Sequence, residues 1–279
     1  MRRIRENRIA MKIVNKTQAE LGISTQDALL LLTQIASNKI DTIVPTSSSL
    51  NVDDIDGFGL TILRKSVKML NTLVFVCVRL QDYVVANAIV RMLADSLAVY
   101  RLIYASEDED EKIYRHYLYI KDGLSSRVDA MEHDLEYNGT ISYEAFQALN
   151  DRYTDTRQSD KSVINHCNEI LANHKYATLY PEFHRRTCTE KSSNWKYKIL
   201  GSHLKAKNNQ YTWKELYELI DKREDIIVCI SSHLSQYIHG LCVSNILDDN
   251  NIEEFEPLLS FGMVFIGIIN QELDKLKKL

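Results

Sequence analysis

The chain has 279 residues, with 34 basic and 38 acidic side chains and a formal net charge of −4. That balance excludes a generally basic surface of the kind that coats nucleic acid, although it is compatible with a local basic patch. The chain contains 9 glycines and 3 prolines, which favours long helices over a β-sandwich or a loop-rich α/β enzyme. We therefore expect an all-α fold, in a single domain that covers residues 1–279.

Five scattered cysteines without a Cys-x-x-Cys spacing indicate free thiols in a reducing compartment, so we expect a cytoplasmic protein. The basic start of the chain is not followed by the apolar core of a signal peptide. The most apolar windows, residues 69–78 and 261–269, are shorter than the roughly 20 residues of a spanning helix. We therefore expect no membrane partner, and we expect no cofactor. We also expect no metal site, because His174, His184 and Cys188 supply no recognised ligand pattern.

The first half of the chain predicts an N-terminal helix and loop (15–56) and the first core helices (60–137). The helix begins at an N-cap in 24–27 and ends near Asn38, and the loop runs through Pro45 and the acidic stretch 53–59. Apolar residues at helical spacing predict a helix over 60–79, and Asp82 is expected to cap the next helix, 83–104. The acidic run 106–111 starts a third helix that should end near 137–139.

The second half predicts a peripheral helical excursion (140–194) and the closing core helices (195–279). In the excursion we expect two helices, 143–150 and 161–173, separated by a hydrophilic stretch, and then irregular chain over 180–194. The closing helices should cover 195–205, 211–240 with a break near Lys222, and about 252 to the end. The apolar stripes predict an up-and-down bundle, which we expect to form a homodimer through an exposed helix face.

The predicted helix 83–104 is apolar almost all round, yet it carries Arg91 and Asp95 one turn apart. An unpaired buried charge is costly, so a partner from another helix is expected. The best candidate is the apolar stretch 231–240, in which Ser231, Ser235 and His239 recur every fourth residue. The predicted site therefore joins two distant helices. Its members are Arg91, Asp95, Asn87, Arg101, Ser235 and His239.

These residue types can bind and cleave a phosphodiester. Arginine offers a fixed fork of donors to phosphate, aspartate can orient its neighbours, and histidine can exchange a proton near neutral pH. We expect a nucleotide or RNA phosphate to bind in an interhelical pocket, with Arg91 and His239 as the catalytic pair of a metal-independent ribonuclease. The other four residues would bind or orient. The alternative is a non-enzymatic scaffold or partner-binding bundle whose polar core fixes helix register.

Four features between Leu60 and Leu241 resemble an uncharacterised family of bacterial helical proteins that is grouped with the HEPN-like bundles. They are Arg91-x-x-x-Asp95, the late Trp195, a tyrosine-rich segment and Ser235-x-x-x-His239-Gly240. The resemblance implies a HEPN-like bundle with a polar interhelical pocket, and a role in stress or phage defence. Two positions depart from the pattern. Asp95 stands where glutamate is usual, and the Arg-x(4–6)-His spacing of HEPN ribonucleases is absent.

Overall fold

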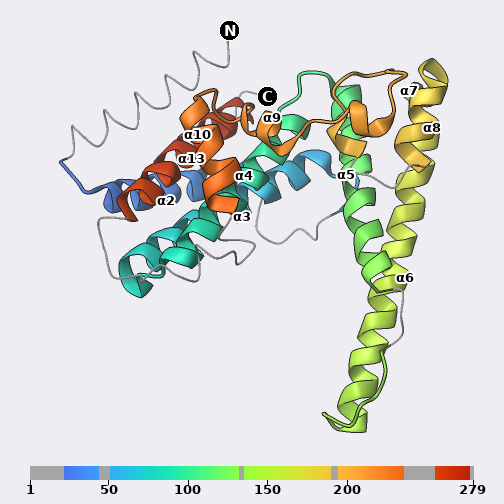
Figure 1. Ribbon diagram of the computed structural model, residues 1–279, viewed down its shortest axis with the longest axis horizontal. Helices are drawn as coiled ribbons and strands as arrows, with labels where there is room; N and C mark the ends of the chain where they lie inside the picture. The colour runs from blue at the N-terminus through green and yellow to red at the C-terminus, as the bar shows by residue number, and fades with distance from the viewer. Residues whose placement is uncertain (1–21, 44–50, 132–134, 190–193, 236–254, 277–279) are drawn as a thin grey trace. The chain divides into compact units, whose positions relative to one another are not determined.

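The computed structural model describes residues 22–43, 51–131, 135–189, 194–235 and 255–276. These residues form helices and loops and no strand, so the predicted all-α class is confirmed. They group into two compact units (Figure 1). Unit 1 comprises the described residues up to Ala105 and from Thr212 onward, and unit 2 is formed by Ser106–Tyr211. The expected single domain stays a prediction.

Unit 1 is a layered set of helices around an apolar core. Helix α13 packs against α2, α3 and α4, and α9 packs against α4 (Figure 1). Gly262 allows the close approach of α13, because a Cβ there would lie 2.7 Å from Cδ2 of Leu29. The elements of unit 1 are α2 (Thr25–Ile43), α3 (Ile55–Phe75), η1 (Val76–Leu80), α4 (Tyr83–Ile103), α9 (Trp213–Tyr217), α10 (Glu224–Val228), η4 (Cys229–His233) and α13 (Phe255–Leu276).

Short polar side chains set the helix starts in unit 1. The Ser24 hydroxyl accepts a hydrogen bond from the Asp27 amide, and Asp82 accepts one from the Val85 amide, as the sequence predicts. The prediction of a loop over 53–59 is wrong, because Asp54 caps α3 and helix begins at Ile55. The predicted break near Lys222 in the helix 211–240 is confirmed, because Lys222 lies in the loop between α9 and α10.

Helix α4 is the most deeply embedded element of unit 1. By length and composition it could cross a membrane, but 56% of its most apolar window is buried inside the protein. A packed core helix passes the same test, so this single helix is weak evidence for a span. Helix α4 also carries the charged residues Arg91, Asp95 and Arg101.

Unit 2 is built on two long antiparallel helices, α5 and α6, which lie side by side (Figure 1). Arg127 of α5 forms a two-pronged ion pair with the buried Asp160 of α6, with Nε 2.6 Å from Oδ2. The elements of unit 2 are α5 (Glu109–Ala130), α6 (Tyr143–Asn173), α7 (Lys175–Leu179), α8 (Pro181–Thr189), η2 (Asn194–Lys196) and η3 (Ala206–Asn208).

Several predicted elements of unit 2 are wrong. Helix α5 ends at Ala130 rather than near 137–139, and the predicted pair of helices over 143–173 is one continuous helix. The hydrophilic stretch between them contains neither glycine nor proline, so polar side chains extend the helix into solvent. Residues 181–189 are helical as well, and Pro181 suits the first helical position.

The predicted helix over 195–205 is replaced by a loop. After η2 the chain turns, and Tyr197 pairs with Gln210 in an isolated antiparallel bridge. The Asn209 side chain accepts from the amide of Ile199 and donates to its carbonyl, so it replaces the hydrogen bonds that a helix would supply. Gly201 adopts φ +70° at the turn, a conformation that ends helices.

Candidate functional site

Arg91 is fastened in unit 1 by three protein groups. Its Nη1 donates to the carbonyl oxygen of Ile230 over 2.6 Å, and its Nε donates to Asp95 Oδ1 over 3.1 Å. The Tyr217 ring centroid lies 4.9 Å from the guanidinium carbon, and the Tyr217 hydroxyl donates to the same Asp95 oxygen over 2.6 Å. We call these residues and the Ile230 carbonyl the Arg91 cluster. The cluster joins α4 to a segment more than a hundred residues away in the sequence. The acceptor in that segment is a backbone carbonyl, whereas the sequence analysis expected polar side chains.

Local structure explains how these groups meet. Thr212 and Glu215 form a capping box that starts α9, and Tyr217 follows one turn later. Ile230 lies in the π turn η4. In this turn hydrogen bonds span five residues, so the Leu234 amide donates to the Cys229 carbonyl. Arg91 adds a charged donor to a backbone carbonyl of this turn.

The electrostatics of the Arg91 cluster centre on Asp95. Burial raises the pKa of this carboxyl, and the hydrogen bonds from Tyr217 and Arg91, with the charge of Arg91, oppose the rise. Burial and the neighbouring Asp95 also raise the pKa of the Tyr217 hydroxyl, which therefore stays a donor at neutral pH. The Asp95 side chain is 33% exposed, whereas the Arg91 side chain is 10% exposed. Solvent therefore reaches the Asp95 carboxylate more easily than the Arg91 guanidinium.

The other residues of the predicted site do not all reach Arg91. Arg101 forms an ion pair with Glu272 of α13, with Nη1 2.8 Å from Oε1, and it lies about 15 Å further along α4. Asn87 is fully buried and donates to the Tyr83 carbonyl of its own helix. Ser235 is half-buried after η4. His239 lies outside the described residues, so its pairing with Arg91 stays a prediction.

Unit 2 contains a second arginine cluster that sequence reasoning missed. Arg115 Nη1 donates to the carbonyl oxygen of Trp195 over 2.7 Å, and Nη2 lies 2.7 Å from Glu111 Oε1 on the same helix. The Tyr197 ring centroid lies 3.7 Å from the guanidinium carbon. We call this group the Arg115 cluster. In the sequence, Glu111 and Arg115 are an acid–arginine pair four residues apart beside Tyr114. The polar residues around them make the helix look solvent-exposed, so the pair does not stand out.

A cysteine and a histidine also meet in unit 2. Cys188 Sγ lies 3.6 Å from His184 Nδ1, and the buried Tyr114 hydroxyl lies 3.1 Å from the same nitrogen. Burial raises the pKa of the Cys188 thiol and lowers the pKa of His184. Both groups are therefore neutral at neutral pH, whereas a nucleophilic cysteine needs a thiolate. The pair fits packing around Tyr114 better than catalysis.

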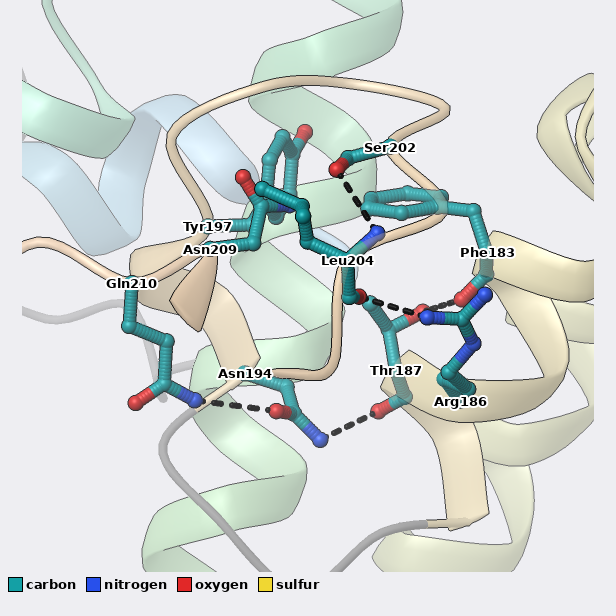
Figure 2. Close-up of a pocket in the computed structure, with 9 residues that line it drawn as sticks. All are labelled: Phe183, Arg186, Thr187, Asn194, Tyr197, Ser202, Leu204, Asn209 and Gln210. Carbon is teal, nitrogen blue, oxygen red and sulfur yellow. Dashed lines mark hydrogen bonds between the residues drawn. The ribbon is translucent and has the colours of Figure 1, made fainter. Parts of the chain in front are cut away.

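The structure offers little room for a small ligand in the neighbouring hollow of unit 2. Nine residues of α8 and the 194–211 loop line this hollow, including Arg186, Asn194 and Leu204 (Figure 2). The free space is about that of one water molecule. Within the described ranges, no group of three or more histidine, cysteine, aspartate or glutamate side chains could hold a metal ion.

No family model, no curated protein and no solved structure matches the chain. The functional argument therefore rests on the residues themselves.

Proposed function

We propose that the protein is a non-enzymatic, partner-binding helical protein whose arginine clusters hold irregular segments against its long helices. The observation that carries this proposal is the bonding of Arg91. Two of its nitrogen atoms donate to protein oxygens, and its face lies beside Tyr217. The Arg91 side chain is also only 10% exposed, so little of its guanidinium is open to a phosphate from solution. The Arg115 cluster supports the same role, because it repeats the arrangement in unit 2.

A phosphate-directed function is the second candidate, and Asp95 supports it. This carboxyl has a raised pKa, is one-third exposed and stands beside an arginine, which is the setting of a general base. In this proposal a HEPN-like bundle binds a nucleotide or RNA phosphate at the Arg91 cluster with the half-buried Ser235. It cleaves RNA without a metal, in stress or phage defence.

One set of measurements separates these two functions. Single-stranded RNA cleavage in a chelator and nucleotide binding by calorimetry are followed for the wild type and for Arg91→Lys. The partner-binding proposal expects neither cleavage nor binding in the wild type, and a loss of stability in the variant. RNA cleavage by the wild type that disappears in Arg91→Lys at unchanged stability contradicts it and supports the second candidate. Arg115→Lys is the matched control, because it disturbs an equivalent cluster in the other unit.

The partner that unit 1 suits best is a second copy of this chain. Leu30, Leu31 and Ile35 of α2 are each about two-fifths exposed, and the neighbouring exposed Gln34 and Asn38 carry no charge. This face is apolar at its centre and carries the exposed Asp27 and Asp41 toward its ends, and its apolar centre can pair with that of a second copy about a two-fold axis. Sedimentation velocity of the wild type and of Leu31→Lys tests this. We expect a dimer that becomes a monomer, and a monomeric wild type contradicts the proposal.

A further inference from the structure

Residues 194–211 of unit 2, here called the basic loop, carry four lysines and no acidic residue, although the chain as a whole has a net charge of −4. The lysines are Lys196, Lys198, Lys205 and Lys207. Lys205 and Lys207 are exposed and form no ion pair with any residue that the structure describes. The surface of the loop is therefore locally positive against a mildly acidic background.

The basic loop is held in one conformation. The Lys198 amide donates to the Asn209 carbonyl over 2.7 Å, and the Tyr211 amide donates to the Lys196 carbonyl over 2.8 Å. Arg186 of α8 donates to the carbonyls of His203 and Leu204, and the second of these hydrogen bonds is drawn in Figure 2. The exposure of the loop's side chains is thus a feature of an ordered structure.

Aliphatic side chains stand out from this ordered loop. Ile199 is 59% exposed and Leu204 is 51% exposed. Tyr180 extends the surface to α7, because its ring lies against Gly201, where a Cβ would be 2.6 Å from Tyr180 Cδ1. Its neighbour Leu179 is 60% exposed. Exposed aliphatic groups on a rigid turn are costly in water and favour an apolar partner.

We infer that the basic loop docks on an anionic lipid bilayer, with Ile199, Leu204 and Leu179 entering the interface and Lys198, Lys205 and Lys207 facing the lipid phosphates. Apolar groups that enter the headgroup region and lysines beside an anionic surface are the two contributions that hold peripheral proteins on membranes. The sequence-based expectation of no membrane partner came from windows too short to span a bilayer. A docking loop requires no spanning segment.

The observations favour lipid over nucleic acid. Proteins that hold single strands expose aromatic rings on which bases stack. In the basic loop, Trp195 and Tyr197 are buried, and Tyr197 is occupied by Arg115. Beside the loop the Tyr180 ring is 36% exposed, but it lies against Gly201, and the more exposed apolar groups, Ile199, Leu204 and Leu179, are aliphatic and suit acyl chains. The inference does not rest on the proposed function, since the apolar and basic side chains that would meet the bilayer lie outside both arginine clusters, although the loop also contains Trp195 and Tyr197 of the Arg115 cluster.

Co-sedimentation of the full chain with vesicles tests the inference. The vesicles are phosphatidylcholine alone, or phosphatidylcholine with phosphatidylserine. We expect binding to the anionic vesicles alone. Lys205→Glu/Lys207→Glu should weaken this binding by roughly 25-fold or more, because each lysine contributes about fivefold at an anionic surface. Ile199→Ser/Leu179→Ser should remove the binding that persists at high salt, where charge attraction is screened.

Matched variants separate the loop from general charge and hydrophobicity. Lys65→Glu/Lys68→Glu changes two exposed lysines of α3 by the same total charge, and Leu149→Ser removes an exposed aliphatic group from α6. Both should bind anionic vesicles like the wild type. Equal weakening by Lys65→Glu/Lys68→Glu contradicts the inference, because the attraction would then depend on net charge and not on the loop.

A second measurement needs no variant. Acetylation of lysines in the wild type, read by mass spectrometry, should be slowed at Lys205 and Lys207 by anionic vesicles and unchanged at Lys65 and Lys68. No vesicle binding by the wild type overturns the inference. Protection of the loop lysines by single-stranded RNA but not by vesicles also overturns it and assigns the surface to nucleic acid. None of these outcomes bears on RNA cleavage at Arg91, so the two proposals fail separately.

Discussion

The two units use the same device to hold an irregular turn against a helix. In unit 1, Arg91 bridges Asp95, the face of Tyr217 and the carbonyl of Ile230 in a π turn. In unit 2, Arg115 bridges Glu111, the face of Tyr197 and the carbonyl of Trp195 in a 3₁₀ turn. In each turn a backbone carbonyl accepts a charged hydrogen bond from the arginine. The repetition indicates that such a cluster is first a means of folding.

The difference between the two clusters lies in their burial and in the tyrosine hydroxyl. Arg115 is 4% exposed and lies closer to its ring than Arg91 does. Tyr217 donates to Asp95, whereas the buried Tyr197 hydroxyl has no hydrogen-bond partner in the described structure. The following predictions use these differences. Trp213 lies in unit 1 and Trp195 in unit 2, so each unit is followed by its own tryptophan in a background in which the other is replaced by phenylalanine.

The largest effect is expected where an ion pair is fully enclosed. Arg101 and Glu272 are 2% and 3% exposed, so Glu272→Leu leaves a buried arginine charge without its acidic partner. We expect the free energy of unfolding of unit 1 to fall by about 3–5 kcal/mol in urea titrations followed by Trp213 fluorescence. Adding Arg101→Met should restore most of it. A double variant as unstable as the single one contradicts the buried-charge explanation.

The two cluster arginines come next. Arg115→Ala should cost unit 2 about 3 kcal/mol, and Arg91→Ala should cost unit 1 about 2 kcal/mol, since each change removes the charged donor to a carbonyl and a cation–π contact. The remaining acids are partly exposed and can be hydrated. Urea titrations read at Trp195 and Trp213 compare them. A much larger cost at Arg91 than at Arg115 contradicts the equivalence of the clusters.

These comparisons also show what the sequence predicts. Asp82 and the acidic run before α5 define helix starts because capping depends on a few neighbouring residues. The contact of Arg91 with a distant segment is predicted because an arginine in an apolar helix needs an acceptor. Tyr217 and Ile230 are not predicted, since a ring face and a backbone carbonyl leave no mark in a residue pattern. Arg115 is missed because polar neighbours make its helix look solvent-exposed.

A smaller effect distinguishes the two tyrosines. Tyr217→Phe removes a hydroxyl that donates to Asp95 over 2.6 Å and should cost unit 1 about 1 kcal/mol. Tyr197→Phe removes a buried hydroxyl without a partner, so unit 2 should be unchanged or slightly more stable. Thermal and urea unfolding of both variants measure the difference. If Tyr197→Phe costs as much as Tyr217→Phe, the hydrogen bond to Asp95 does not distinguish the clusters.

The smallest expected effect is an opposite response of the two units to acid. Burial lowers the pKa of His184 and of His174 below the usual 6.5, so their contribution to unit 2 is complete above that pH. As the pH falls below 6.5 the unfolded chain binds protons first, and the stability of unit 2 falls until the folded histidines are protonated as well. In unit 1 the pKa of Asp95 is raised above 3.8. The folded state therefore binds that proton first, and acidification toward this range adds stability.

Urea titrations over this pH range, read at Trp195 and Trp213, test the opposite signs. His184→Gln should reduce the loss of unit 2 stability below pH 6.5 only in part, because His174 still binds a proton in that range. His203 is exposed, so His203→Gln should leave the loss of stability unchanged. Asp95→Asn should remove the gain in unit 1. Because linkage depends only on the difference in proton binding between folded and unfolded chain, a unit 2 that gains stability below pH 6.5 would contradict the buried, neutral state of these histidines. The cysteine beside His184 would then have a charged imidazole neighbour, which is the arrangement that activates a thiol.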